Sequence, residues 1–250
     1  MFDFTLFTPL QWIAILAIFL WSGFIRTGIG FGGAAFSLPL LLLVSDQPLF
    51  FLPIIALHLF VASAITITGR LQQIDWRFIQ RALAWLTLPK ILGVIGLLSL
   101  PSTWLVNFVF AITLLYAINW VLQRNLHYRS PWIDRALLIL GGYVSGASLV
   151  GSPLIAAVAI QRVTLAHYRN TLFILWFILV SIKLVAFIVA GVDLQWTWAA
   201  LLLIPAGIGH ILGLKAHHLL LHQDSRIIQR ILGAALLLVA SIGLYSTNLT

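Results

Sequence analysis

The chain has 250 residues, of which 62% are hydrophobic and 8% are charged, and its mean hydropathy is +1.08. This composition excludes a soluble globular protein, and the absence of cysteine excludes disulfides, thiol catalysis and thiolate metal sites. The net charge of +8 would suggest nucleic acid in a soluble protein, but membrane proteins concentrate Lys and Arg on their cytoplasmic side. We therefore expect an all-α integral membrane protein in a lipid bilayer, with no nucleic-acid partner and no cleaved signal peptide.

The first hydrophobic stretch, residues 10–44, is broken at its centre by Arg26-Thr-Gly-Ile-Gly-Phe-Gly-Gly33. A continuous helix of that length would measure about 52 Å, far more than one crossing of a ~30 Å hydrocarbon core. The pattern therefore predicts a helical hairpin that turns at the glycines. Three unbroken spans follow it, at 48–68, 83–100 and 104–122.

The second half of the chain repeats this order. Residues 136–160 form a second hydrophobic stretch, which is interrupted by glycines and serines between Gly141 and Pro153. We predict a second hairpin there, followed by spans at 171–191, 196–214 and 227–245. Broken segments at matching positions of two halves are typical of the binding site of a secondary transporter.

The distribution of basic residues predicts the topology. Eleven of the fourteen Lys and Arg residues lie in four connections, which the positive-inside rule places in the cytoplasm. The second hairpin then enters from the cytoplasm, the first enters from outside, and both termini lie on the non-cytoplasmic side. Each half has one hairpin and three spans, so we predict two inverted-topology repeats, 1–130 and 131–250. The basic residues are Arg70, Arg77, Arg81, Arg124, Arg129, Arg135, Arg162, Arg169, Lys215, Arg226 and Arg230.

Charges inside the predicted membrane segments are all basic. The six acidic residues are aspartates in connections, whereas the segments contain Arg26, Lys90 and Lys183. A cation at the bilayer centre costs about 2.5–3.5 kcal/mol, so it normally has an internal partner or a function. With no carboxylate in the segments to act as partner, we expect a transported anion in that role.

Structural readings of these residues remain open. The Lys90 stem could snorkel to the headgroups, and Arg26 could brace its hairpin through backbone carbonyls. His58 could be a satisfied polar core residue, although repeat alignment puts it one turn from the equivalent of Lys183. His210 falls one turn from the equivalent of Lys90, so we predict a pseudo-symmetric basic cavity.

Backbone N–H groups at the glycine turns could bind an anion without any side chain, and nearby hydroxyls add donors. The alternative is that the glycines only allow close helix packing, as we expect for Gly209-x-x-x-Gly213. We expect no cofactor and no metal. The predicted substrate-binding residues are Arg26, Gly28, Gly30, Gly32, Gly33, His58, Lys90, Ser145, Gly146, Ser148, Gly151, Ser152, Lys183 and His210.

Six short motifs follow one another along the chain: Gly28-Ile-Gly-Phe-Gly-Gly-Ala-Ala-Phe-Ser-Leu-Pro39, Ile74-Asp-Trp-Arg77, Leu88-Pro…Gly93, Gly146…Gly151-Ser-Pro153, His167-Tyr-Arg-Asn-Thr171 and Pro205…Gly209…Gly213. In this order they resemble the sulfite exporter TauE/SafE family of membrane permeases. The chain departs from the family at Leu149-Val-Gly-Ser-Pro153, where Gly-x-Gly-Gly-Pro is common, and at His210, where a small residue is expected. The resemblance implies transport of small sulfur-containing or organic anions across a bacterial plasma membrane.

We therefore predict a secondary transporter of small anions that works by alternating access, with export as the favoured direction. The alternatives are an intramembrane enzyme, with Ser148 as its nucleophile, and an anion channel. We do not expect an enzyme, because no nucleophile–base or metal motif stands in the spans. The sequence leaves a homo-oligomer open.

Overall fold

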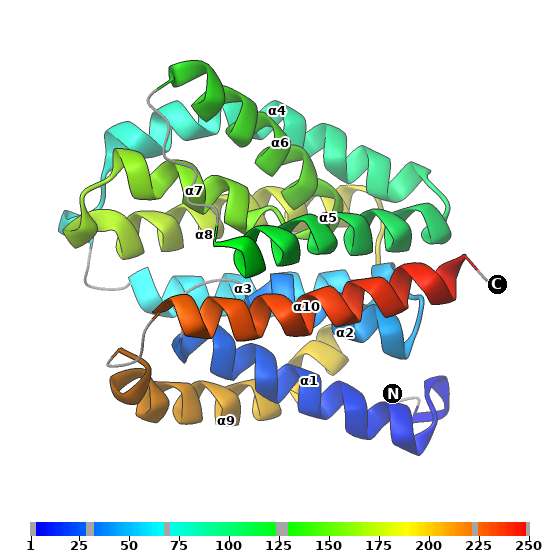
Figure 1. The fold of residues 1–250 in the computed structure, drawn as a ribbon. Coiled ribbons are helices and arrows are strands. Elements are labelled where there is room, and N and C mark those ends of the chain that lie inside the picture. The colour runs from blue at the N-terminus through cyan, green and yellow to red at the C-terminus, as the bar shows by residue number, and fades with distance from the viewer. Residues whose placement is uncertain (1–3, 29–32, 68–70, 124–129, 222–224, 249–250) are drawn as a thin grey trace. The chain divides into compact units, whose positions relative to one another are not determined.

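The computed structural model describes residues 4–28, 33–67, 71–123, 130–221 and 225–248, and in them the chain is helical, with no strand (Figure 1). Short 3-10 helices occupy Phe4–Leu6 and Leu71–Gln73. The α-helices are α1 Pro9–Gly28, α2 Gly33–Val44, α3 Pro48–Ile67, α4 Trp76–Ser99, α5 Ser102–Leu122, α6 Pro131–Ser148, α7 Ser152–Arg162, α8 Leu165–Val189, α9 Trp196–Leu221 and α10 Ser225–Thr247.

Seven of the described helices are long and apolar enough to cross a membrane. Six of them, α3, α4, α5, α8, α9 and α10, correspond to the six predicted spans, and the seventh is α1. The all-α membrane fold class is confirmed. Helix α4 begins at Trp76 and not at 83, because the Asp75 carboxylate accepts a hydrogen bond from the Phe78 N–H (2.9 Å) and caps the helix.

In each broken segment, the second helix packs back against the first. In the first, the Gln11 side-chain amide donates to the Val44 carbonyl (2.9 Å), which joins the start of α1 to the end of α2. In the second, a methyl-sized group on Gly141 would meet Leu154 and Ile155 across the turn. The two helices of each segment therefore run antiparallel, and the assignment of each segment to a repeat stays a prediction.

The chain divides into two compact units, each assembled from separated segments. Unit 1 comprises residues 1–51, 101–125 and 195–250, and its closest packing joins α1 to α9, which run alongside each other in Figure 1. A Cβ on Gly23 would lie 2.0 Å from the Ala206 carbonyl oxygen, and one on Gly209 would lie 1.9 Å from that of Leu20. Because no side chain fits there, the two backbones touch. This confirms the packing role expected for Gly209.

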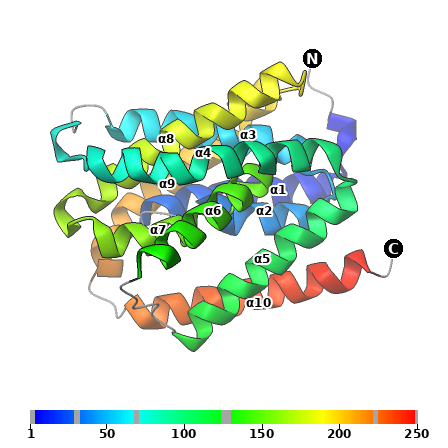
Figure 2. The ribbon, with the colours of Figure 1, turned by 90° about the horizontal axis from the view of Figure 1, so that it is seen from above.

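Helices α5 and α10 also pack together in unit 1, and α2 contacts both (Figure 2). Buried apolar side chains of α1, α2, α5 and α10 form a cluster at their contacts: Ile25, Phe36, Ala117, Leu232 and Leu236. The first hairpin is therefore fixed to helices from the middle and from the C-terminal end of the chain.

Unit 2 comprises residues 52–100 and 126–194, and α4 packs against α6 within it. The contact is again backbone on backbone, because a Cβ on Gly93 would lie 2.2 Å from the Tyr143 oxygen and one on Gly146 would lie 2.1 Å from the Lys90 oxygen. A buried apolar core also joins α4, α6, α7 and α8, and its members include Leu86, Leu138, Ile155 and Leu175.

The pairing of helices is equivalent in the two units. In each, the first arm of one hairpin packs against the second unbroken span of the other sequence half: α1 with α9, and α6 with α4. The units therefore draw on both halves of the chain, and the division into repeats 1–130 and 131–250 stays a prediction.

Candidate functional site

The second hairpin turns where α6 ends. Ser148 is the last residue of α6, and Leu149 follows it in the left-handed conformation (φ 62°), which allows its N–H to bond the Ser145 carbonyl (3.1 Å). Ser152 and Pro153 begin α7. The last four carbonyls of a helix lack partners within it, so this break exposes backbone acceptors in the interior of unit 2.

Two lysines from different helices bind these carbonyls. The Lys90 ammonium, on α4, donates to the Ser145 hydroxyl (2.8 Å) and carbonyl (3.3 Å). The Lys183 ammonium, on α8, donates to the Gly146 carbonyl (2.6 Å) and lies over the Phe187 ring (5.3 Å). Both lysine side chains are 0% exposed, so the snorkelling alternative for Lys90 is wrong.

This lysine pair, Lys90 and Lys183, has no anionic partner in the part of the chain that the structure describes, where the recorded ion pair is Arg162 with Asp134. The two ammonium groups also repel each other. Carbonyl dipoles at a helix C-terminus favour cations, but they do not neutralise two buried charges. Each ammonium has three N–H donors, so one on Lys90 and two on Lys183 stay unused by described residues.

Other predicted residues of unit 2 surround the same turn. Gly151 abuts Ser145, since a Cβ on it would lie 2.6 Å from the Ser145 nitrogen. The Ser152 hydroxyl is buried and lacks a hydrogen-bond partner among the described residues. The Ser148 hydroxyl donates within its own helix to the Val144 carbonyl (2.8 Å). His58 is buried on α3, and neither lysine hydrogen-bonds to it.

The break of the first hairpin, in unit 1, holds a different set of groups. The Thr27 hydroxyl lies 3.0 Å from the Gly23 carbonyl and 2.5 Å from Nδ1 of His210 on α9. A carbonyl can only accept, so the Thr27 proton points to Gly23 and Nδ1 carries the proton shared with Thr27. When His210 is neutral, its Nε2 is therefore the unprotonated ring nitrogen. Arg26 interacts electrostatically with the same imidazole.

The remaining predicted residues of this hairpin are glycines, which offer only backbone groups to a ligand. Gly28 is the last residue of α1, and Gly33 is the first of α2, where a Cβ would lie 3.2 Å from that of Arg26. Gly30 and Gly32 lie outside the described residues. The prediction that both hairpin turns contribute to one site is not tested within either unit.

Sequence reasoning missed one polar junction in unit 2. The Asp75 N–H donates to the Thr171 hydroxyl (2.9 Å), and the Asn170 amide donates to the Gln73 side-chain oxygen (2.9 Å). Two of the motifs that carried the resemblance, around Asp75 and Thr171, thus bind each other. The polar side chains of both motifs, in an otherwise apolar chain, were the signal that could have paired them.

Comparisons with curated proteins and with solved structures give no match. The family comparison does. Over residues 15–242, nearly the whole chain, the sequence matches the model described as sulfite exporter TauE/SafE, and the protein belongs to this family of membrane transporters.

Proposed function

We propose that the protein is a secondary transporter that carries small sulfur-containing or organic anions, and that the lysine pair binds the anion. The observation that carries the proposal is the convergence of two fully buried ammonium groups on consecutive carbonyls of a broken helix without a carboxylate. An anion between them would supply the missing charge and accept the N–H donors that the protein leaves unused.

A purely structural role for the pair is the weaker explanation. One neutral donor would satisfy the Gly146 carbonyl, and burying an ammonium for that purpose costs several kcal/mol of hydration. Two such charges that repel each other increase this cost. A site that is filled for part of each cycle by an anion accounts for both lysines.

The other predicted residues complete the proposal. The Ser152 hydroxyl and the backbone around Gly151 would add donors beside the lysine pair. Arg26, His210 and the glycines of the first hairpin would form the counterpart in unit 1, with alternating access between two inverted halves. An inside-negative potential supplies about 2.3 kcal/mol per charge per 100 mV to an anion leaving a cell, so export is the favoured direction.

The test is flux in vesicles reconstituted with purified protein, with sulfite, sulfate, thiosulfate, sulfoacetate and taurine as separate substrates. We expect saturable uptake of at least one of the anions, and its loss in Lys183→Met. Lys215→Met is the matched control, because Lys215 is an exposed lysine on α9. Flux that never saturates would replace the transporter by a channel, and equal flux in Lys183→Met and wild type would overturn the site.

A further inference from the structure

Arg135, in the second turn of α6, lies over two indole rings. Its guanidinium carbon is 4.6 Å from the centre of the Trp132 ring and 5.1 Å from that of Trp85 on α4. Both tryptophans are exposed, by 73% and 39% respectively. Contacts with two aromatic faces orient the planar guanidinium and leave the N–H groups around its edge available to an acceptor.

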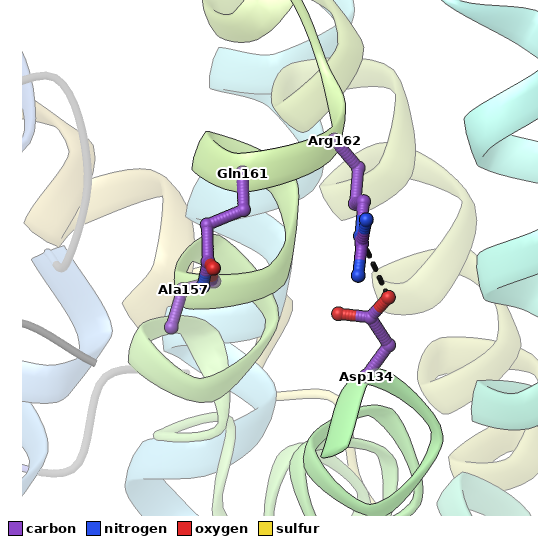
Figure 3. Close-up of polar contacts among 4 residues, drawn as sticks. All are labelled: Asp134, Ala157, Gln161 and Arg162. Atoms are coloured by element: carbon purple, nitrogen blue, oxygen red, sulfur yellow. Dashed lines mark hydrogen bonds and ion pairs between the residues drawn. The ribbon is translucent and has the colours of Figure 1, made fainter. Parts of the chain in front are cut away.

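The charge of Arg135 is not neutralised within the described residues. The adjacent carboxylate, Asp134, bonds instead to Nε of Arg162 at the end of α7 (2.7 Å), and Figure 3 shows it directed at that side chain. No hydrogen-bond acceptor for the Arg135 guanidinium is found in the described part of the chain. An oriented fork of donors therefore lacks an anion.

The exposed face of α4 places this group at a membrane boundary. Going along the helix, that face carries Arg77 and Arg81, then Trp85, then the exposed aliphatic side chains of Leu88 and Leu92. A change from basic to aromatic to aliphatic side chains within a few turns is typical of the level of the lipid headgroups. Arg81, one turn before Trp85, adds a second exposed cation there.

We propose that Arg135, Trp85 and Trp132 form a binding site for the phosphate of an anionic glycerophospholipid. Two phosphate oxygens accept from the guanidinium fork, and the acyl chains follow the exposed aliphatic face of α4 past Leu88 and Leu92. The site is separate from the lysine pair and does not depend on the proposed transport function. A free phosphate ion offers the same oxygens but has no chains to bury against α4.

The experiment measures lipid retention on purified protein by native mass spectrometry, after incubation with equal amounts of phosphatidylglycerol and phosphatidylcholine. We expect wild type to retain phosphatidylglycerol preferentially. Arg135→Gln should lose at least fivefold of that preference, and a Trp85→Ala/Trp132→Ala double variant should lose it with Arg135 still present. The matched control is Arg230→Gln, because Arg230 is an exposed arginine on α10 that lies over no aromatic ring of the described residues.

Equal phosphatidylglycerol retention in Arg135→Gln and wild type would overturn the proposal, as would an equal loss in Arg230→Gln. Displacement of the lipid by millimolar inorganic phosphate would show that the site recognises phosphate alone, and would also overturn the proposal. Arg135→Lys separates loss of the binding site from misfolding of the variant, because it keeps the charge but not the planar fork. It should stay folded and show an intermediate preference, and an unchanged preference would contradict the role of the fork.

Discussion

The described residues beside the two hairpin breaks differ in chemistry. At the second break, two ammonium groups donate to the Ser145 and Gly146 carbonyls, and each is fully buried. At the first, the contact between helices is a hydroxyl–imidazole pair, Thr27 with His210, with one arginine beside it. The comparison indicates that charge is concentrated at one break, so anion affinity should depend mainly on unit 2.

The largest effect should follow removal of a lysine. We expect Lys183→Met to lower transport at least about 100-fold, and Lys90→Met about 10-fold, because Lys183 has two unused donors and Lys90 has one. The measurement is initial flux in proteoliposomes together with the thermal midpoint of the purified variants.

The thermal midpoint separates binding from scaffolding. If the lysine pair binds substrate, the methionine variants should unfold within a few degrees of wild type, because the lost hydrogen bond is offset by removal of a buried charge. A fall in midpoint that matches the fall in flux would assign the lysines to structure alone.

Adding a methyl group where two helix backbones touch should have the next largest effect. Gly146→Ala places a Cβ 2.1 Å from the Lys90 oxygen, and Gly209→Ala places one 1.9 Å from the Leu20 oxygen. Each should cost about 1–3 kcal/mol of stability, since backbones must separate. Only Gly146→Ala should also raise the apparent KM of the anion, because it moves α4 and Lys90; a similar KM change in Gly209→Ala would contradict the contrast between the breaks.

A smaller effect is expected at Ser145. Ser145→Ala removes the hydroxyl that Lys90 bonds at 2.8 Å but keeps the carbonyl contact. The loss of one such bond is worth about 1 kcal/mol, or roughly a fivefold change in affinity. The thermal shift produced by titrating the transported anion measures it, and Ser181→Ala is the control, because the Ser181 hydroxyl donates to the Phe177 carbonyl within α8 (2.7 Å) and is not among the predicted binding residues.

The smallest effect should come from the first break. Thr27→Val removes the acceptor of the His210 Nδ1–H, and we expect about a threefold fall in flux. His210→Gln should also flatten any dependence of flux on pH between about 5 and 8, the range in which histidine titrates. An unaltered pH profile in His210→Gln would exclude this residue from proton coupling.

Hydropathy was sufficient to predict the helices of this chain, because a bilayer core demands long apolar segments whatever they pack against. The starts of helices were harder. Asp75 extends α4 by seven residues into a stretch that contains Arg77 and Arg81, and a polar cap has no hydropathy signal.

Candidate site residues could be named from the sequence, but their contacts could not. The absence of carboxylates singled out Lys90 and Lys183, and symmetry between the halves placed His58 and His210 near the equivalents of these lysines in a basic cavity, which stays a prediction. The actual partners are carbonyls of Ser145 and Gly146, and every residue type has a carbonyl. A contact between a side chain and the backbone of a distant segment leaves no pattern in the sequence, so only the packing of α4 and α8 around α6 reveals it.

The interleaving of the two units has a consequence for synthesis. Unit 2 ends at Leu194, whereas unit 1 takes its last segment from residues 195–250. The glycine face of α1 is therefore covered only after α9 has been synthesised and inserted into the bilayer. Because chains fold from the N-terminus as they are made, the earliest helix becomes one of the last to be locked in place. Truncations after residue 194 should leave the lysine pair assembled and α1 without its α9 partner.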